Sequence, residues 1–592
     1  NLENYTIFTY SRSDTNGMLN HLFACQSDPT TRASAGAFMG DAACAQVARD
    51  SGSIFTVEAS EANPRSLIDL WQVINTTTWT ANDALTIKNI GSYSEYKEIY
   101  QNNASGDNLI MPSSLNLVRG GVVTAVPTGA FAGAHYNFVG LDTHPNYPYT
   151  SAQRSMTDEL QAHGRVLDNR LMWQAGGYME LSEPLQTVGQ LTSTLASCAN
   201  LNTLTCTDVL SQIVAGGAAA VGTASTRSIR NRFQDYGLYG QGTFEITHQL
   251  SMTAGLRYTW DRHRQEGAQL TYNFPPVKGV PAGGVVTFCS NSLVFRPRKF
   301  TTKESDCAVS YLAESHRPTW LVDLEYKPID DVMVWAKYAR GYRQGLANTA
   351  APGFEILQPE KVDSYELGAK TSFGGSMPGT FDIVGFYNNL ENQQIQASAV
   401  ARVGSGVSSS NTVINAGKSK IEGVEVDATI KPVEPVTVNL GYTYLKTQLE
   451  SLTLPDLSTN PLFGSFSVTA AVGGPLVLSP KNKVVLGVTY KMPVPERLGE
   501  VSVGGNFVHT DSQLTSAASP LGHVPATDLL NLNLNWNSVA ESQVDLSVFA
   551  TNVTNKKYPA FVVGSLLSTA FEGSIAAEPA MYGLRLRYRF GG

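Results

Sequence analysis

The stretch that most restricts what this chain can fold into is residues 235–261, where apolar and polar side chains alternate along two runs. Leu238 stands in the first run, and Leu256 and Trp260 stand in the second. A period of two places successive side chains on opposite faces of a β-strand. The short segment 247–249 separates the runs, so the sequence predicts a hairpin with one apolar and one polar face.

Each strand of this hairpin is long enough to cross a bilayer at a tilt, and each ends in aromatic residues. These features suit an outer-membrane β-barrel, whose strands need about 9–11 residues and turn one face to lipid and the other to water. The alternative is a hairpin of a soluble sandwich, whose strands usually run only about 5–6 residues. One hairpin does not separate the two folds, so repetition of the pattern has to decide.

The same alternation recurs along the whole chain, and short turns there alternate with long polar loops. Short turns are predicted at residues 167–170 and 327–331, for example, whereas the long loops hold all the cysteines. This asymmetry is typical of periplasmic turns and extracellular loops. We count about 18 strands, an even number, as in single-chain bacterial barrels. The repetition predicts an all-β fold, a transmembrane antiparallel β-barrel.

Composition argues against other classes for this chain of 592 residues. A chain of this length usually divides into several soluble domains unless one closed architecture absorbs it. No run approaches the roughly 18 apolar residues of a transmembrane helix. The formal net charge of -8 provides no basic stripe for nucleic acid. Since neither a nucleophile elbow nor an acidic metal cluster occurs, we predict no enzymatic activity, no cofactor and no metal site.

The six cysteines form three pairs of sequence neighbours, each pair within one long loop. Local pairs in polar loops predict disulfides formed in an oxidising compartment such as the periplasm. Metal binding is the alternative, but no CxxC pair or clustered histidine supports it. The predicted disulfides are Cys25–Cys44, Cys198–Cys206 and Cys289–Cys307.

Two groups of residues are candidates for function. Exposed loops often carry binding residues. The loop that ends near residue 151 supplies five aromatic or imidazole side chains as candidates for ligand contact: His135, Tyr136, His144, Tyr147 and Tyr149. The alternative role for each of them is packing within the loop. The polar face of the last strand supplies candidates for contact with the lumen or with a plug, a charged lumen wall being the simpler reading: Arg585, Arg587 and Arg589.

Four stretches resemble TonB-dependent outer-membrane receptors, and they occur in the order of that family. Residues 338–343 (YARGYR) are similar to its "yarGfr" segment, and residues 359–370 to its "PE…YELG.K" strand. Residues 415–425 resemble the "NAG…GvE" strand, and residues 550–558 the "NltnkkY" turn. Each stretch also has a structural explanation, because glycines permit turns or close strand approach and tyrosines mark the membrane interface. Together they cover the chain from about residue 236 onward.

The resemblance implies a receptor in the bacterial outer membrane that takes up a scarce, bulky nutrient. The ligand would be a siderophore, vitamin, saccharide or aromatic compound, and lipid and lipopolysaccharide would surround the barrel. The TonB–ExbB–ExbD complex would supply energy through an N-terminal plug domain. The alternative is a passive, porin-like channel.

The sequence departs from the family because it shows neither the plug domain nor the TonB box. Barrels of such transporters have about 22 strands, so about 18 strands leave four to be supplied with the plug. An open edge in lipid would expose unpaired backbone groups, each at a cost of several kcal/mol. We therefore expect residues 1–592 to be the C-terminal barrel domain, with the plug and the first barrel strands in another part of the polypeptide or in another chain.

Overall fold

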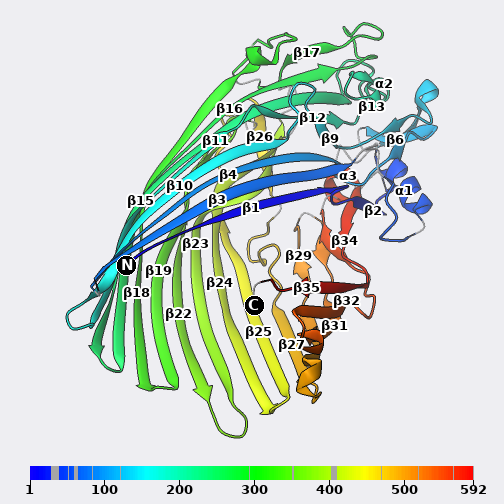
Figure 1. Ribbon diagram of the computed structural model, residues 1–592. Helices are drawn as coiled ribbons and strands as arrows, with labels where there is room; N and C mark the ends of the chain where they lie inside the picture. Colours follow the sequence, from blue (N-terminus) through cyan, green and yellow to red (C-terminus); the bar gives the residue numbers. More distant parts are fainter. Residues whose placement is uncertain are drawn as a thin grey trace.

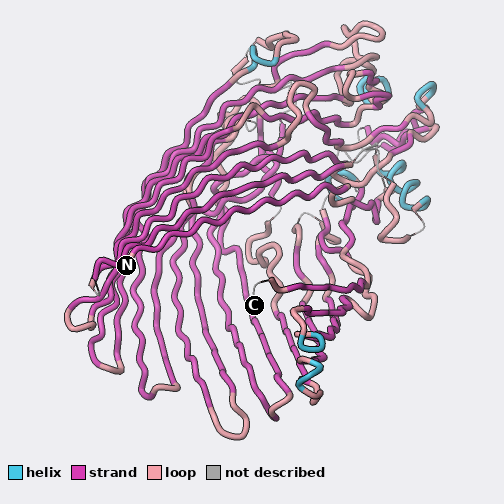
Figure 2. Tube along the Cα trace, viewed as in Figure 1, coloured by secondary structure: helices cyan, strands magenta, loops and turns pink. Residues whose placement is uncertain are grey.

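The chain folds into one large curved sheet that carries long loops at one end (Figure 1). Strands make up most of the trace, and the helices are short (Figure 2). The α-helix α1 (Gly40–Arg49) has 10 residues, and no helix in the described residues is long and apolar enough to cross a membrane. The computed structural model describes residues 1–28, 39–50, 52–58, 64–82, 84–119, 122–291, 294–295, 297–349, 352–401, 410–468, 470–517, 519–563 and 566–590.

Eighteen long strands follow one another across the sheet, each antiparallel to the next, which confirms the predicted fold class and the strand count. They are β1 (Leu2–Thr15), β3 (Arg65–Asn82), β4 (Leu85–Asn103), β10 (Ser151–Val166), β11 (Leu171–Pro184), β15 (Thr223–Thr247), β16 (Leu250–Asn273), β18 (Val309–Ile329), β19 (Val332–Arg343), β22 (Glu360–Phe373), β23 (Gly379–Ala401), β24 (Ser410–Val433), β25 (Val436–Leu452), β27 (Asn482–Lys491), β28 (Glu500–Thr510), β31 (Thr527–Asn537), β32 (Val544–Thr551) and β35 (Met581–Tyr588).

Four short strands extend the sheet to 22 strands at its loop end. They are β9 (Gly140–Thr143), β12 (Val188–Thr194), β17 (Val286–Cys289) and β26 (Phe463–Val468). The predicted alternation of short turns and long loops is also present, and the two kinds of connection lie at opposite ends of the sheet (Figure 1).

The hairpin predicted over residues 235–261 is present but longer than the prediction. β15 has 25 residues and β16 has 24, and only two residues separate them. The additional length lies at the loop end, where arginines and glutamines obscure the alternation.

Register decides which side chains share a face of the sheet, because directly opposed residues lie on the same side. Leu256 lies opposite Gly240 on one neighbouring strand and opposite Trp320 on the other. Leu256 is 59% exposed, whereas the adjacent Arg257 places its guanidinium 5.4 Å from the centre of the Tyr178 ring. We call the side of Leu256 the outward face and the side of Arg257 the inward face.

Four of the long loops pack together at the loop end, and we call them the loop cap. A buried apolar cluster joins them, to which the four loops contribute Leu22, Leu109, Leu210 and Phe571 among others. β2 (Asn20–Cys25) of the first long loop pairs with β34 (Phe571–Ala576) of the last one. The loop cap therefore connects the two ends of the sheet, although no pairing joins β1 to β35 in the described residues.

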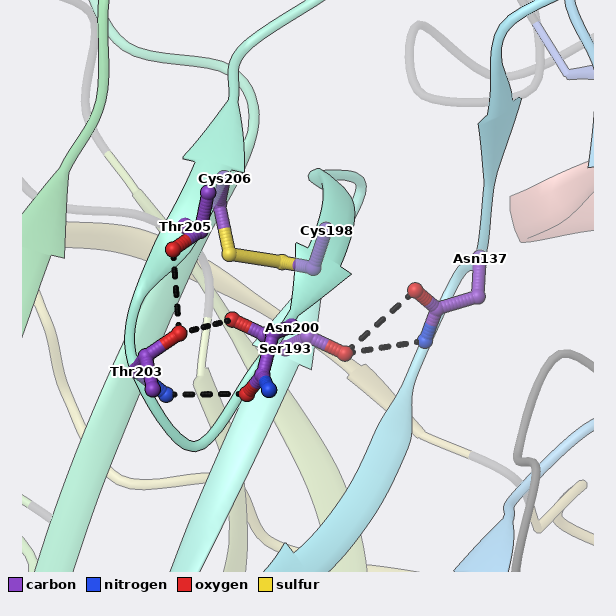
Figure 3. Close-up of a disulfide and its surroundings, with 7 residues drawn as sticks. All are labelled: Asn137, Ser193, Cys198, Asn200, Thr203, Thr205 and Cys206. Carbon is purple, nitrogen blue, oxygen red and sulfur yellow. Dashed lines mark hydrogen bonds between the residues drawn. A yellow bond between two sulfur atoms is a disulfide. The ribbon is translucent and has the colours of Figure 1, made fainter. Parts of the chain in front are cut away.

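All three predicted disulfides are present, Cys25–Cys44, Cys198–Cys206 and Cys289–Cys307. Figure 3 shows the second, which links β13 (Ser197–Asn200) to β14 (Thr205–Thr207). Beside it, Asn137 donates from Nδ2 to Ser193 Oγ at 3.1 Å. This hydrogen bond attaches β12 to the neighbouring loop of the cap.

Candidate ligand-binding site

The loop cap uses two of the predicted ligand-contact residues for its own packing. Tyr136 is 2% exposed within the buried cluster of the cap. The ring of His144 is also buried, and its Nδ1 accepts a hydrogen bond from the Asn146 N–H at 3.0 Å. His144 Nε2 then faces Glu304 Oε2 at 2.9 Å, which joins two loops of the chain. These two side chains are buried because the loops of the cap lie close together and aromatic and imidazole rings fill the space between the loops.

The other three loop candidates are more accessible. His135 is exposed and its Nδ1 lies 2.9 Å from Asn108 Oδ1. Tyr147 and Tyr149 are half-buried, and the ring of Tyr147 lies 4.5 Å from that of His144. Their contact with a ligand stays a prediction.

Arg585 and Arg587 of the last strand lie on the inward face, and Arg589 directly follows that strand. Arg585 and Arg587 are opposite Ser547 and Asp545 in the register. Arg589 Nη2 donates to Ser538 Oγ at 2.6 Å and to Asp545 Oδ1 at 2.8 Å. One of the three charges is therefore paired within the barrel wall, and contact with a plug stays a prediction.

A larger candidate site lies on the inward side of the loop ends of β15 and β16. It is a cavity of about 810 Å³, within the range of small-molecule sites. Its walls also include the loop that follows β16, together with Thr349 and Phe463 from loops much later in the chain. We call it the basic cavity.

The charge of the basic cavity is entirely positive in its described lining. Arg227, Lys278 and Arg298 line it, and no aspartate or glutamate does. Arg227 lies opposite Gln269 on the inward face, and its buried Nε has no hydrogen-bond partner in the described chain. An arginine without an acidic partner is suited to bind an anion, because its guanidinium donates charge-assisted hydrogen bonds in a fixed planar geometry.

The remaining lining combines rings with small polar groups. Phe288, Phe295 and Phe463 line the cavity, and the Arg298 guanidinium lies 4.1 Å from the centre of the Phe288 ring. Thr271 and Ser290 share a hydrogen bond of 2.7 Å between their hydroxyls. Such a lining can hold aromatic rings and an anionic group of one ligand.

The third disulfide fixes one wall of the basic cavity. Cys289 and Cys307 both line it, and their bond joins β17 to the 3-10 helix η3 (Glu304–Cys307). Two hydrogen bonds hold the same loop: Lys299 Nζ donates to the Asp306 carbonyl at 2.8 Å, and Thr301 Oγ1 donates to Asp306 Oδ2 at 2.6 Å. This wall is therefore held in place without help from a ligand.

Asp107 is a buried acid within the loop cap, outside the basic cavity. Its Oδ2 accepts a hydrogen bond from the Phe138 N–H at 2.6 Å, and its buried Oδ1 has no partner in the described residues. Burial raises the pKa of Asp107 from 3.8 to about 7. A raised pKa means that the folded cap favours the protonated acid. Below about pH 4 the acid is protonated in both the closed and the open cap, so the closed cap keeps its full stability. As the pH rises from about 4 to about 7, the open cap loses this proton more readily, and the closed cap becomes less stable relative to it.

We expect the loop cap to open more readily at pH 8 than at pH 5, by on the order of 3 kcal/mol, and Asp107→Asn to remove most of this difference. The asparagine keeps an acceptor for the Phe138 N–H but does not ionise. Hydrogen–deuterium exchange of residues 104–150, corrected for intrinsic rates, measures the opening at both pH values. An equal pH dependence in Asp107→Asn would contradict the assignment.

Comparison with known proteins identifies relatives of the chain. Residues 6–555 match the family model "TonB dependent receptor-like, beta-barrel". A curated relative, described as "Probable TonB-dependent siderophore receptor PiuA" of Acinetobacter baumannii, is 22% identical over 286 residues. That match covers 45% of this chain and 34% of the relative, so the chain spans about a third of the relative's length.

Solved structures show the same fold at low sequence identity. The siderophore receptor PiuA from Acinetobacter baumannii has a TM-score of 0.58 at 16% identity, covering 99% of this chain and 71% of its own. The ferric yersiniabactin uptake receptor FyuA from Yersinia pestis has a TM-score of 0.58 at 12% identity, covering 90% and 63%. The ferric-catecholate import receptor Fiu from E. coli K12 has a TM-score of 0.57 at 15% identity, covering 99% and 71%.

Proposed function

Because the chain belongs to the TonB-dependent receptor β-barrel family, we propose that it is the barrel of an outer-membrane receptor that takes up a small anionic ligand with energy from TonB. The ligand that fits best is a siderophore-type metal chelate with aromatic, metal-binding groups. Three relatives are named as receptors for siderophores or ferric chelates, and their names supply the class rather than the compound.

The basic cavity carries this proposal. Ferric catecholate chelates are anionic and aromatic, so they need positive charge without competing acids and rings to pack against. Arg227, Lys278 and Arg298 supply the charge, and Phe288 and Phe463 supply the rings. The cavity lies at the loop end of the inward face, where a ligand arriving from outside the cell would first meet the barrel.

Energy coupling requires parts beyond the sheet. We propose that a plug domain fills the space inside the barrel, contacts the inward Arg585 and Arg587, and passes energy from the TonB–ExbB–ExbD complex. The same domain and further strands would satisfy the backbone edges of β1 and β35, which are unpaired with each other in the described chain. An edge left open in lipid is costly.

The outward face suits the lipids of the outer membrane, including lipopolysaccharide. Tyr338 stacks on Tyr365 with ring centres 4.9 Å apart, as in the aromatic girdle of a membrane barrel. Toward the loop end of this face, Arg340 Nε and Asp363 Oδ1 form an ion pair of 2.6 Å, and Lys361 Nζ and Glu391 Oε2 one of 2.7 Å. We propose that this charged band lies among the lipid headgroups.

The test measures uptake of radiolabelled iron, supplied as a ferric tris-catecholate, by cells that make the full-length native receptor. Uptake should depend on both the receptor and TonB, while the purified receptor should carry little ion current in planar bilayers. A large steady current, together with uptake that persists without TonB, would instead establish a passive porin-like channel. Equal uptake by cells with and without the receptor would exclude this ligand class for the receptor.

A further inference from the structure

β1, β3, β4 and β10 lie side by side in the sheet (Figure 1). On the outward face, where lipid-facing positions should be apolar, these four strands carry polar side chains. One row across these strands consists of residues that oppose one another in the register, namely Thr6, Asn75, Gly91 and Asp158. The row continues through Met179 to Tyr236 of the outward face. The adjacent row holds Asn4, Thr77 and Asn89. We call these seven residues the polar patch.

The polar patch lies at membrane depth. On β3, Asn75 and Thr77 stand between Trp71 and Trp79, which face the same way. We assign these two tryptophans to the two aromatic belts of a membrane barrel, which places the residues between them at membrane depth. The flanking outward residues are apolar and exposed, with Phe8 66% and Leu2 68% exposed. Lipid contact alone does not explain polar groups there, because buried donors and acceptors in hydrocarbon are costly and ionisable ones more so.

The patch has an amide half and an acid half. In the amide half, over β1 and β3, Asn75 Nδ2 donates to Thr6 Oγ1 at 2.8 Å, and Asn4 Nδ2 donates to Asn75 Oδ1 at 3.0 Å. In the acid half, over β4 and β10, Asn89 Nδ2 donates to Asp158 Oδ1 and Oδ2 at 3.1 and 3.2 Å. No other hydrogen bond to this carboxylate occurs in the described residues, although a carboxylate can accept about four.

We propose that the polar patch is the contact surface for a second copy of this chain. Two copies inserted the same way in one membrane are related by a two-fold axis along the membrane normal. This axis keeps every residue at its own depth and reverses left and right between the facing surfaces. It therefore places the acid half of each copy against the amide half of the other, so each Asp158 gains amide donors from its partner copy.

Gly91 stands at the centre of the patch and leaves room for close approach. It has no side chain between Asn75 and Asp158 in the row, so the backbones of two copies could meet there as small residues permit at membrane interfaces. A Cβ added to Gly91 would lie 3.4 Å from Asp158 Oδ2 and nearer to nothing else. A cysteine at this position therefore fits the monomer.

Cross-linking tests the contact directly. All six cysteines of the chain are in disulfides, so an introduced cysteine supplies the only reactive thiol of this chain. In outer membranes that contain the full-length native protein, Gly91→Cys treated with a short bis-maleimide should give a covalent dimer. The control Leu367→Cys, on the outward face of β22 and 63% exposed, should stay monomeric.

A second measurement weighs the polar groups themselves. Asp158→Leu combined with Asn75→Val should lower the dimer-to-monomer ratio at least tenfold in native-lipid discs, whereas Thr371→Val, outward on β22, should not. These substitutions remove polar groups from a lipid-facing surface, so the barrel itself should still fold. A monomer at every protein density, equal cross-linking through Leu367→Cys, or a Gly91→Cys product with a different protein would each overturn the proposal.

Discussion

Arg227→Gln is expected to weaken binding of a ferric tris-catecholate to the full-length receptor by about 10- to 150-fold. Arg227 is the cavity arginine whose Nε has no partner in the described chain. A hydrogen bond to a charged group contributes about 1.5–3 kcal/mol, which corresponds to that range of affinity. Glutamine keeps a donor at the distance of the arginine Nε but lacks the guanidinium and its charge. The dissociation constant is measured by titrating the purified receptor with the ferric tris-catecholate and following the quenching of the receptor's intrinsic fluorescence.

The matched control is Arg232→Gln, five residues further along β15. Arg232 lies on the outward face, and its Nη1 is 3.9 Å from Glu266 Oε1, so this change should leave affinity within about twofold. Equal losses in both variants would show that the overall charge of the strand, and not the basic cavity, attracts the ligand. Unchanged affinity in Arg227→Gln would place the binding site elsewhere.

Leu256→Arg is expected to cost about 2–4 kcal/mol of barrel stability, because arginine at mid-membrane on the lipid face is strongly unfavourable. Arg257→Leu, the adjacent change, should cost much less, since its side chain lies on the wet inward face. On the inward face, Gly237 leaves the space that the Arg257 side chain fills, because a Cβ added to Gly237 would lie 2.6 Å from Arg257 Nη2. Urea unfolding from lipid vesicles measures the free energy of unfolding of both variants and of the unchanged protein.

The comparison is informative because the two residues are adjacent in β16 and differ only in the face they occupy. The folded fraction after refolding into vesicles, read from gel mobility without heating, is a second readout. If both variants lost the same folded fraction, the assignment of outward and inward faces across the register would be wrong.

Local patterns allowed much of the fold to be predicted. Alternation around Leu256 depends on two neighbouring positions of one strand, so the sequence alone indicated strands, their approximate number and the face of Leu256. Cys289 and Cys307 are 18 residues apart, and such short separations made the disulfide pairing predictable. The motif at residues 359–370 indicated the family, which the match over residues 6–555 confirmed.

Contacts between distant segments decided the rest. Alternation could place Arg227 on one face of its strand. That Arg227 lines a cavity depends on Arg298 and Phe463, which come from separate loops. Tyr136 is buried in the same apolar cluster as Phe571 of another cap loop, and no local pattern predicts this burial; its contact with a ligand stays a prediction. The sequence by itself thus determined the strands, turns and disulfides, which arise from neighbours along the chain. Only the tertiary structure decided the basic cavity, the loop cap and the polar patch, because register and loop packing bring together residues that no local pattern relates.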